Sequence, residues 1–195
     1  MPLAEVGALC PHCRGEGHKP FQTILQLGLF RDPLRKIVHQ IKYHHRWTLA
    51  EFLADQLLLQ EAVKGLLTET QTLVAIPLHP WRQFSRGFNQ AEVIARRLAD
   101  KCRIRFARPL VRLKNTETQT HLHDKKKRFD NLRDAFGLLR PRHITGKHVV
   151  LVDDVMTTGA TLESAARCLK EAEPASISAI VAAVADPRGK DFEAI

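Results

Sequence analysis

The feature that most constrains this chain is a short aliphatic run that ends in two adjacent acids. Residues Val149 to Val152 are all valine or leucine, a pattern typical of a strand buried on both faces in a parallel sheet. Asp153 and Asp154 follow directly. Successive strand residues point to opposite faces, so both carboxylates cannot lie in one apolar layer. Because a buried carboxylate needs a cation or hydroxyl groups beside it, we predict a polar ligand beyond this strand.

A small turn rich in hydroxyl groups follows the acids, and a helical pattern begins at Leu162. Such a turn before a helix favours a phosphate, because backbone N–H groups and the helix dipole attract anions and a glycine lets the backbone come close. Acids for a sugar diol beside a phosphate cradle suggest a ribose 5-phosphate site. The turn consists of Thr157, Thr158, Gly159, Ala160 and Thr161.

Two simpler interpretations compete with this one. A nucleotidase-type strand of the P-loop class would need a G-x-x-x-x-G-K-[ST] loop earlier in the chain, and the sequence has none. An ordinary strand and turn with two solvated acids is the other alternative.

Composition narrows the class of protein. A chain of 195 residues fits one main domain with a small appendage. No apolar run approaches the roughly 18–20 residues of a membrane helix, so we expect no membrane insertion. The absence of a secretory signal, together with four cysteines, favours a reduced, cytoplasmic setting. The formal charge of +9 suits an anionic partner such as a pyrophosphate compound or nucleic acid, or else marks a solvated basic surface.

The N-terminal segment carries a cysteine pair, Cys10 and Cys13, with the spacing of half a zinc knuckle. A closed zinc site needs four ligands, and the chain has no second C-x-x-C. His12 and His18 are candidate substitutes, and a vestige without metal is the alternative. Cys102 and Cys168 lie in or at the ends of predicted helices and are expected to be small buried residues.

From Phe21 to Leu67 the pattern predicts helices. Trp47 is expected to anchor the core. The first helix also has a basic face, either solvated or a surface for phosphates or nucleic acid strands. Its apolar stripe comprises Leu34, Ile37, Val38 and Ile41, and its basic face Arg35, Lys36, Lys42, His44, His45 and Arg46.

A second apolar strand is predicted over 72–76, followed by a basic loop from Leu78 to Phe88. Asn89 should cap the next helix, with Glu92 completing a capping box. Ligands of open α/β sheets bind at the carboxyl ends of the strands. Arg82 and Arg86 are therefore candidate pyrophosphate ligands, because guanidinium groups match phosphate oxygens in pairs.

The second half of the chain completes the predicted sheet. Strands are expected over 109–113 and 176–184, separated by a long polar segment that contains the run Lys125 to Arg128. Four consecutive cations either form a solvated helix face or close over a ligand and neutralise departing charge.

The chain resembles the ComF/GntX family of proteins related to type I phosphoribosyltransferases. The acidic strand and turn look like the motif that binds phosphoribosyl pyrophosphate (PRPP). The remaining residues that carry the resemblance are Ile41-Lys42-Tyr43, Ile76-Pro77-Leu78-His79, Arg82, Arg86-Gly87-Phe88-Asn89-Gln90-Ala91-Glu92, Arg112, Thr116, Gln119, Leu122, Arg128, Asn131 and Ala135-Phe136.

The resemblance implies a type I phosphoribosyltransferase fold, a parallel twisted sheet flanked by helices, with a small helical and zinc-knuckle-like hood. Asp153 and Asp154 would contact the ribose hydroxyls, with Mg²⁺, and the turn from Thr157 to Thr161 would hold the 5-phosphate. Further binding and catalytic roles fall on Arg86, Gly87, Lys127 and Arg128. The implied domains are a cysteine-pair segment (1–20), a helical hood (21–70), a phosphoribosyltransferase-like domain (71–186) and a tail (187–195).

Two departures from the family pattern matter. In the 6-oxopurine salvage enzymes of this superfamily an acid that helps deprotonate the purine stands where this chain has Thr157, which argues against that purine chemistry. Family members also usually carry a four-cysteine zinc module, of which this chain has what looks like the second pair, Cys10 and Cys13.

Three functions therefore stay open. The chain transfers a phosphoribosyl group from PRPP to an acceptor with release of pyrophosphate, or it is a PRPP-binding accessory protein that acts on single-stranded DNA, or it is a PRPP-sensing regulator. The resemblance implies a role in natural transformation or use of external DNA, with the helicase machinery of DNA uptake as a partner.

Overall fold

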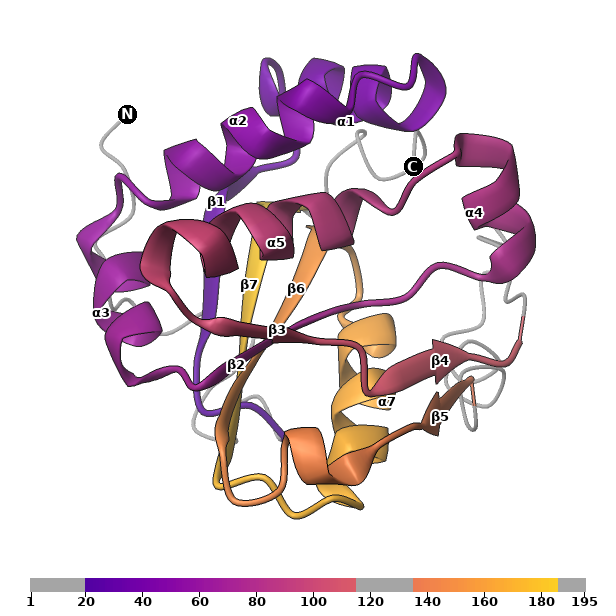
Figure 1. The fold of residues 1–195 in the computed structure, drawn as a ribbon. Helices are drawn as coiled ribbons and strands as arrows, with labels where there is room; N and C mark the ends of the chain where they lie inside the picture. Colours follow the sequence, from indigo (N-terminus) through magenta and orange to yellow (C-terminus); the bar gives the residue numbers. More distant parts are fainter. Residues whose placement is uncertain (1–19, 115–134, 186–195) are drawn as a thin grey trace.

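The structure, a computed structural model, describes residues 20–114 and 135–185. Its centre is a sheet of five parallel strands in the order β1-β7-β6-β2-β3, shown in Figure 1. The strands are β1 (Ile24–Leu29), β2 (Thr72–Ala75), β3 (Arg105–Ala107), β6 (His148–Met156) and β7 (Ser176–Val184). The predicted parallel sheet is thereby confirmed, including the strands around Val150, Val74 and Ile180.

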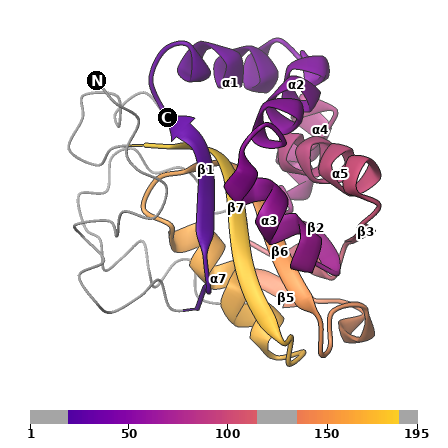
Figure 2. The same ribbon diagram turned by 90° about the vertical axis from the view of Figure 1, so that its left-hand side faces the viewer.

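Helices cover both faces of this sheet, as Figures 1 and 2 show. One face packs against α1 (Leu34–Tyr43), α2 (Trp47–Leu57), α3 (Glu61–Glu69) and α5 (Gln90–Cys102). The other face packs against α7 (Ala160–Lys170) and a small antiparallel pair, β4 (Leu110–Arg112) with β5 (Phe136–Leu138). A short helix, α4 (Pro80–Arg86), follows β2, and a single 3-10 turn, η1 (Pro141–His143), precedes β6.

Strand β6 is buried on both faces because its side chains alternate between two cores. Val150 and Val152 pack with the α1, α2 and α5 helices, whereas Val149 and Leu151 pack with α7. This alternation explains the continuous aliphatic run in the sequence.

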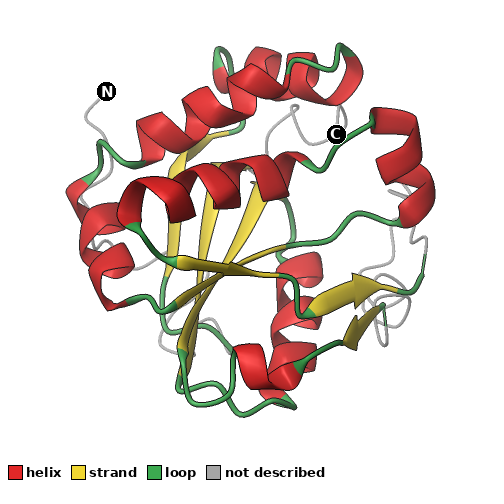
Figure 3. Ribbon diagram, viewed as in Figure 1, coloured by secondary structure: helices red, strands yellow, loops and turns green. Residues whose placement is uncertain are grey.

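The helical prediction for residues 21–67 is wrong at its beginning. Ile24–Leu29 forms β1, which pairs in parallel with β7 and brings Ile24 opposite Ala179. The six residues alternate in character, and Leu25 and Leu27 pack on the α-helical core while Ile24 packs on the α7 side. Helical spacing begins only at Leu34, where α1 starts. Figure 3 shows the strand at the edge of the sheet before the first helix.

The predicted basic loop over 78–88 contains a helix. The ring Nδ1 of His79 accepts a hydrogen bond from the Trp81 N–H (3.3 Å), so His79 caps α4. Pro80 occupies the first turn, and Gly87 ends the helix with a φ of 72°. A proline at the start and a glycine at the end are the expected boundary residues of a helix, and they outweigh the loop-like composition.

Two predictions about burial are also wrong. Trp47 begins α2 and is 51% exposed, and Cys102 ends α5 and is exposed. Both stand at a helix end rather than on an inward stripe. Cys168 is buried on α7 as expected, and burial together with the nearby Glu171 raises the pKa of its thiol to about 11.

The helix after β2 forms as predicted. The Asn89 side chain accepts a hydrogen bond from the Ala91 N–H (3.1 Å) and so caps α5. The inward stripe of α5, consisting of Ala91, Ile94, Ala95 and Leu98, is buried. Glu92 is instead paired with Arg96 and Arg108.

Candidate site at the carboxyl end of the parallel sheet

The two adjacent acids of β6 face different layers of the molecule, as the alternation of a strand requires. Asp154 continues the row of Val150 and Val152, on the side of α1 and α5, and Asp153 continues the row of Val149 and Leu151. The prediction that both acids cannot share one apolar layer is confirmed.

Asp154 is buried and fully engaged. Its Oδ2 lies 3.2 Å from the Lys42 Nζ of α1 and accepts a hydrogen bond from the Gln90 side-chain amide of α5 (3.0 Å). Its Oδ1 accepts a bond from the backbone N–H of Val155 (2.8 Å). Burial disfavours the charged form, but the Lys42 charge and the Gln90 hydrogen bond outweigh it and lower the pKa of Asp154. Asp154 therefore ties two helices to the end of β6.

Asp153 has the opposite character. Its Oδ1 accepts a bond from the backbone N–H of Asp154 (2.9 Å), and within the described residues it has no ion pair. Burial, followed by the negative charge of Asp154, raises the pKa of Asp153 well above its usual value. A cation or a set of hydroxyl donors beside Asp153 would relieve this cost.

Two guanidinium groups lie within electrostatic range of Asp153. Burial and the charge of Arg82 lower the pKa of Arg112, whereas the charge of Asp153 acts in the opposite direction. Arg112 comes from β4, with its guanidinium 5.6 Å from the ring centroid of Phe136. Arg82 comes from α4. The fold therefore gathers one acid and two guanidinium groups from three elements.

The predicted turn and helix start follow directly after β6. Gly159 has a φ of 79° and precedes α7, an eleven-residue helix. The Ala160 N–H donates to the Thr158 hydroxyl oxygen (3.4 Å), and the Gly159 carbonyl accepts the Glu163 N–H (2.9 Å). A methyl group added at Gly159 would find space, the nearest atom being 3.8 Å away, so the φ is what calls for glycine.

Helix α4 brings the predicted pyrophosphate loop to the same end of the sheet, because it directly follows β2, the neighbour of β6. A hydrogen bond of 2.9 Å joins the His45 ring Nδ1 to the Arg86 carbonyl oxygen and ties α4 to the segment after α1. Arg86 ends the helix, one turn after Arg82, and Gly87 follows at its C-cap.

Several predicted site residues lie outside the described residues. These are Cys10 and Cys13 of the candidate zinc site and Lys127 and Arg128 of the basic run. Their roles stay predictions.

Lys42 and Gln90 are the two site residues whose roles sequence reasoning missed. Lys42 was assigned to the basic face of α1, yet it is paired with Asp154. Its position carried a signal, because it lies one turn after Val38 and next to Ile41, both buried. No local pattern pointed from Gln90 to an acid 64 residues away.

The acids can be tested for their fit to Mg²⁺. This ion usually takes one or two carboxylates together with phosphate and water oxygens. Asp153 suits that role, since a cation would offset the repulsion from Asp154, whereas Asp154 already has Lys42 as its cation. Within residues 20–114 and 135–185, no cluster of three or more His, Cys, Asp or Glu side chains could hold a metal by itself. In the same two ranges no helix has the length and apolar character needed to cross a membrane.

Comparison with known proteins identifies the class first. Residues 85–193 match the phosphoribosyl transferase domain family, and this stretch contains the acidic strand, the turn and α7. The chain thus has the parallel sheet flanked by helices of a type I phosphoribosyltransferase fold.

Curated relatives narrow the class to a family. The chain is 33% identical over 174 residues to the DNA utilization protein YhgH of Salmonella typhimurium, covering 87% of this chain and 74% of that protein. It is 32% identical over 169 residues to Competence protein F of Haemophilus influenzae, covering 83% and 72%. With Competence protein ComFC of Bacillus subtilis the identity is 42% over 108 residues, covering 54% and 41%. The chain belongs to the ComF family of phosphoribosyltransferase-like proteins.

Proposed function

We propose that this chain binds PRPP at the carboxyl end of β6. The carrying observation is the division of labour between the two acids. Asp154 is held by Lys42 and Gln90, while Asp153 stands beside Arg112 and Arg82 directly before the turn at Gly159. A ligand that carries a diol and phosphates at both ends meets each of these groups in turn.

Each part of PRPP would contact a different part of this site. The turn from Thr157 to Thr161, at the start of α7, would bind the 5-phosphate through backbone N–H groups. Asp153 would accept hydrogen bonds from the ribose hydroxyls. The diphosphate would extend toward the guanidinium groups of Arg82, Arg86 and Arg112, which can bind phosphate oxygens in pairs.

We further propose that the bound PRPP is a phosphoribosyl donor. The bond between C1 of the ribose and the diphosphate oxygen would break, with its electron pair leaving on pyrophosphate, and a lone pair of the acceptor would form the new bond to C1. Arg82 and Arg86 would stabilise the charge on the departing pyrophosphate. Asp153 would hold Mg²⁺, which when bound spreads the diphosphate charge further. The thiols of Cys102 and Cys168 fit a cytoplasmic, reducing location.

Release of pyrophosphate tests the transferase role. The protein is incubated with PRPP, Mg²⁺ and a panel of bases and nucleotides, and pyrophosphate is measured with a coupled assay. We expect release with one class of acceptor, and loss of at least about 100-fold in rate for Asp153→Asn, from the typical effect of removing one transition-state contact. Asp100→Asn, an exposed acid on α5, is the matched control. Saturable PRPP binding with no release for any acceptor would leave a binding protein.

A second candidate function is binding of single-stranded DNA, favoured by the surface of α4. Trp81 and Phe84 are 66% and 89% exposed, and they alternate with Arg82 and Arg86 on one short helix. Aromatic rings that stack on bases, together with cations for the phosphates, are the two parts of a single-strand binding surface. The printed names of the relatives, which concern DNA utilization and competence, support this proposal.

The DNA proposal is tested by the salt dependence of affinity for an oligothymidylate. We expect the log–log slope to be negative and to become shallower by about 0.7 for each phosphate contact removed, here by Arg86→Ala. Trp81→Ala with Phe84→Ala should weaken binding by about 1–3 kcal/mol per stacked base. Phe52→Ala, at a half-exposed phenylalanine of α2, serves as the control. A flat salt slope would contradict this function.

A further inference from the structure

We propose that a pocket on helix α1 binds the acceptor of the proposed reaction, and that this acceptor is a planar aromatic compound with a negative charge. The inference rests on the proposed function, since it assigns the second substrate of the same site. It adds a binding site of about 390 Å³, which falls within the usual range for small-molecule pockets.

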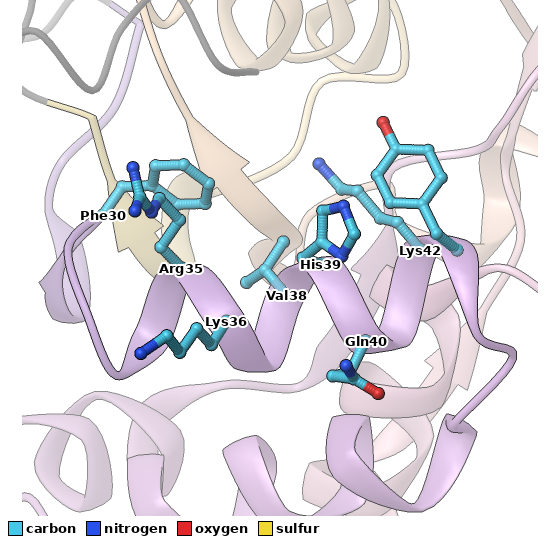
Figure 4. Close-up of a pocket in the computed structure, with 8 residues that line it drawn as sticks. Phe30, Arg35, Lys36, Val38, His39, Gln40 and Lys42 are labelled. Carbon is cyan, nitrogen blue, oxygen red and sulfur yellow. The ribbon is translucent and has the colours of Figure 1, made fainter.

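The pocket faces the interior end of the site. Figure 4 shows Arg35, Val38, His39 and Lys42 projecting from one side of α1, with Phe30 before the helix, while Lys36 and Gln40 project from the opposite side. Tyr43 completes the lining. The described lining residues thus offer cations and rings but no carboxylate.

Lys42 connects this pocket to the acidic pair. Its side chain lines the pocket, and its Nζ lies 3.2 Å from the Asp154 Oδ2. Asp153, proposed to bind the ribose diol, is the next residue along β6. A molecule in the pocket therefore lies beside the sugar, the position from which an acceptor must approach C1.

The charges around the pocket select an anion. Arg35 and Lys36 share one carboxylate, that of Asp32, at 3.3 and 2.9 Å, so one positive charge of this trio is uncompensated. Lys42 is balanced by Asp154. The guanidinium of Arg35 is half-exposed and points to the pocket side of α1, where it can bind an acceptor carboxylate with two hydrogen bonds.

The rings around the pocket select a planar compound. The His39 and Tyr43 rings lie 4.6 Å apart between centroids at an interplanar angle of 44°. Phe30 forms a buried wall, and Tyr43 is 58% exposed. An aromatic ligand can stack on such rings in offset or edge-to-face arrangements, whereas a saturated ring of equal size cannot.

Calorimetric titrations of the full chain test this inference with three probes. Orotate is a planar ring with a carboxylate, uracil is the same ring without it, and cyclohexanecarboxylate keeps the charge without a planar ring. We expect orotate to bind at least about tenfold more tightly than either of the others, the ratio for one charge-assisted hydrogen-bonded contact.

Variants locate the binding. Arg35→Ala should weaken orotate binding about tenfold or more, and Tyr43→Ala by about fivefold. Lys36→Ala removes the same charge from the opposite side of α1 and should change binding by less than about twofold. An equal loss in Lys36→Ala would mean diffuse attraction to a basic surface and would overturn the inference.

A separate titration with PRPP distinguishes this inference from the proposed function. PRPP binding without orotate binding would overturn the acceptor pocket alone. Orotate binding that depends on Arg35, with no PRPP binding, would overturn the proposed function and leave a pocket for planar anions that is not an acceptor site. Binding of both, with orotate tighter in the presence of PRPP, is the expected result.

Discussion

Two aspartates that are neighbours in the chain have opposite environments. Asp154 has a buried cation and an amide as partners, whereas Asp153 is left next to that carboxylate with its own pKa raised by burial and by the charge of Asp154. A group that costs stability in the folded protein but stands at a candidate ligand site is typical of function rather than packing.

Asp153→Asn should therefore stabilise the protein at neutral and basic pH. Because the folded-state pKa of Asp153 is raised, its contribution to stability is fully present below its unfolded pKa and is lost as the pH rises through the folded value. Asparagine keeps the acceptor oxygen for the Asp154 N–H but has no charge to lose. We expect the variant to melt about 2–4 °C higher than the wild type at pH 8, the shift that 1 kcal/mol gives in a chain of this size.

Calorimetry at pH 4 and pH 8 checks this expectation. The difference in melting temperature should be small at pH 4 and grow with pH. A variant that is less stable than the wild type at both pH values would show that Asp153 is a structural residue.

The elements differ in how well the sequence predicted them, and the reason is periodicity. Strands β6 and β7 and helices α1, α5 and α7 have long, regular patterns and form where expected. β1 was missed because its six alternating residues were read together with the helices that follow. α4 was missed because its seven residues bury no side chain, so it has no apolar stripe, and only its boundary residues announced it.

The start of α7 offers a test at this scale. Gly159 has a positive φ, so Gly159→Ala should cost roughly 1–2 kcal/mol of stability and disturb the proposed phosphate cradle. Gly65→Ala is a matched control, since no atom lies within 4 Å of an added methyl group in the middle of α3, and it should add roughly 0.5–1 kcal/mol.

Urea denaturation measures both variants, and a phosphate titration follows the site. The account requires opposite signs of the stability change, with anion binding weakened in Gly159→Ala alone. Equal stability effects, or unchanged anion binding in the Gly159 variant, would argue against a cradle at this turn.

At the scale of the whole molecule, the site is assembled from segments that are distant in sequence. The acids and the turn were predictable, because a buried strand, two carboxylates and a helix start are consecutive. Lys42, Gln90 and Arg112 were not placed at the acids, because only the order of the strands and the packing of α1 and α5 bring them together. The site therefore depends on the N-terminal helices as much as on the matched domain at 85–193.

The division between a held Asp154 and an available Asp153 is tested most directly by titrating PRPP, with Mg²⁺, into the wild type and Asp153→Asn. The account predicts saturable binding of one PRPP to the wild type and at least about a tenfold weaker affinity in the variant, as expected for loss of a charge-assisted contact, with folding intact. Absence of saturable binding to the wild type, or equal affinity in both proteins, would contradict it.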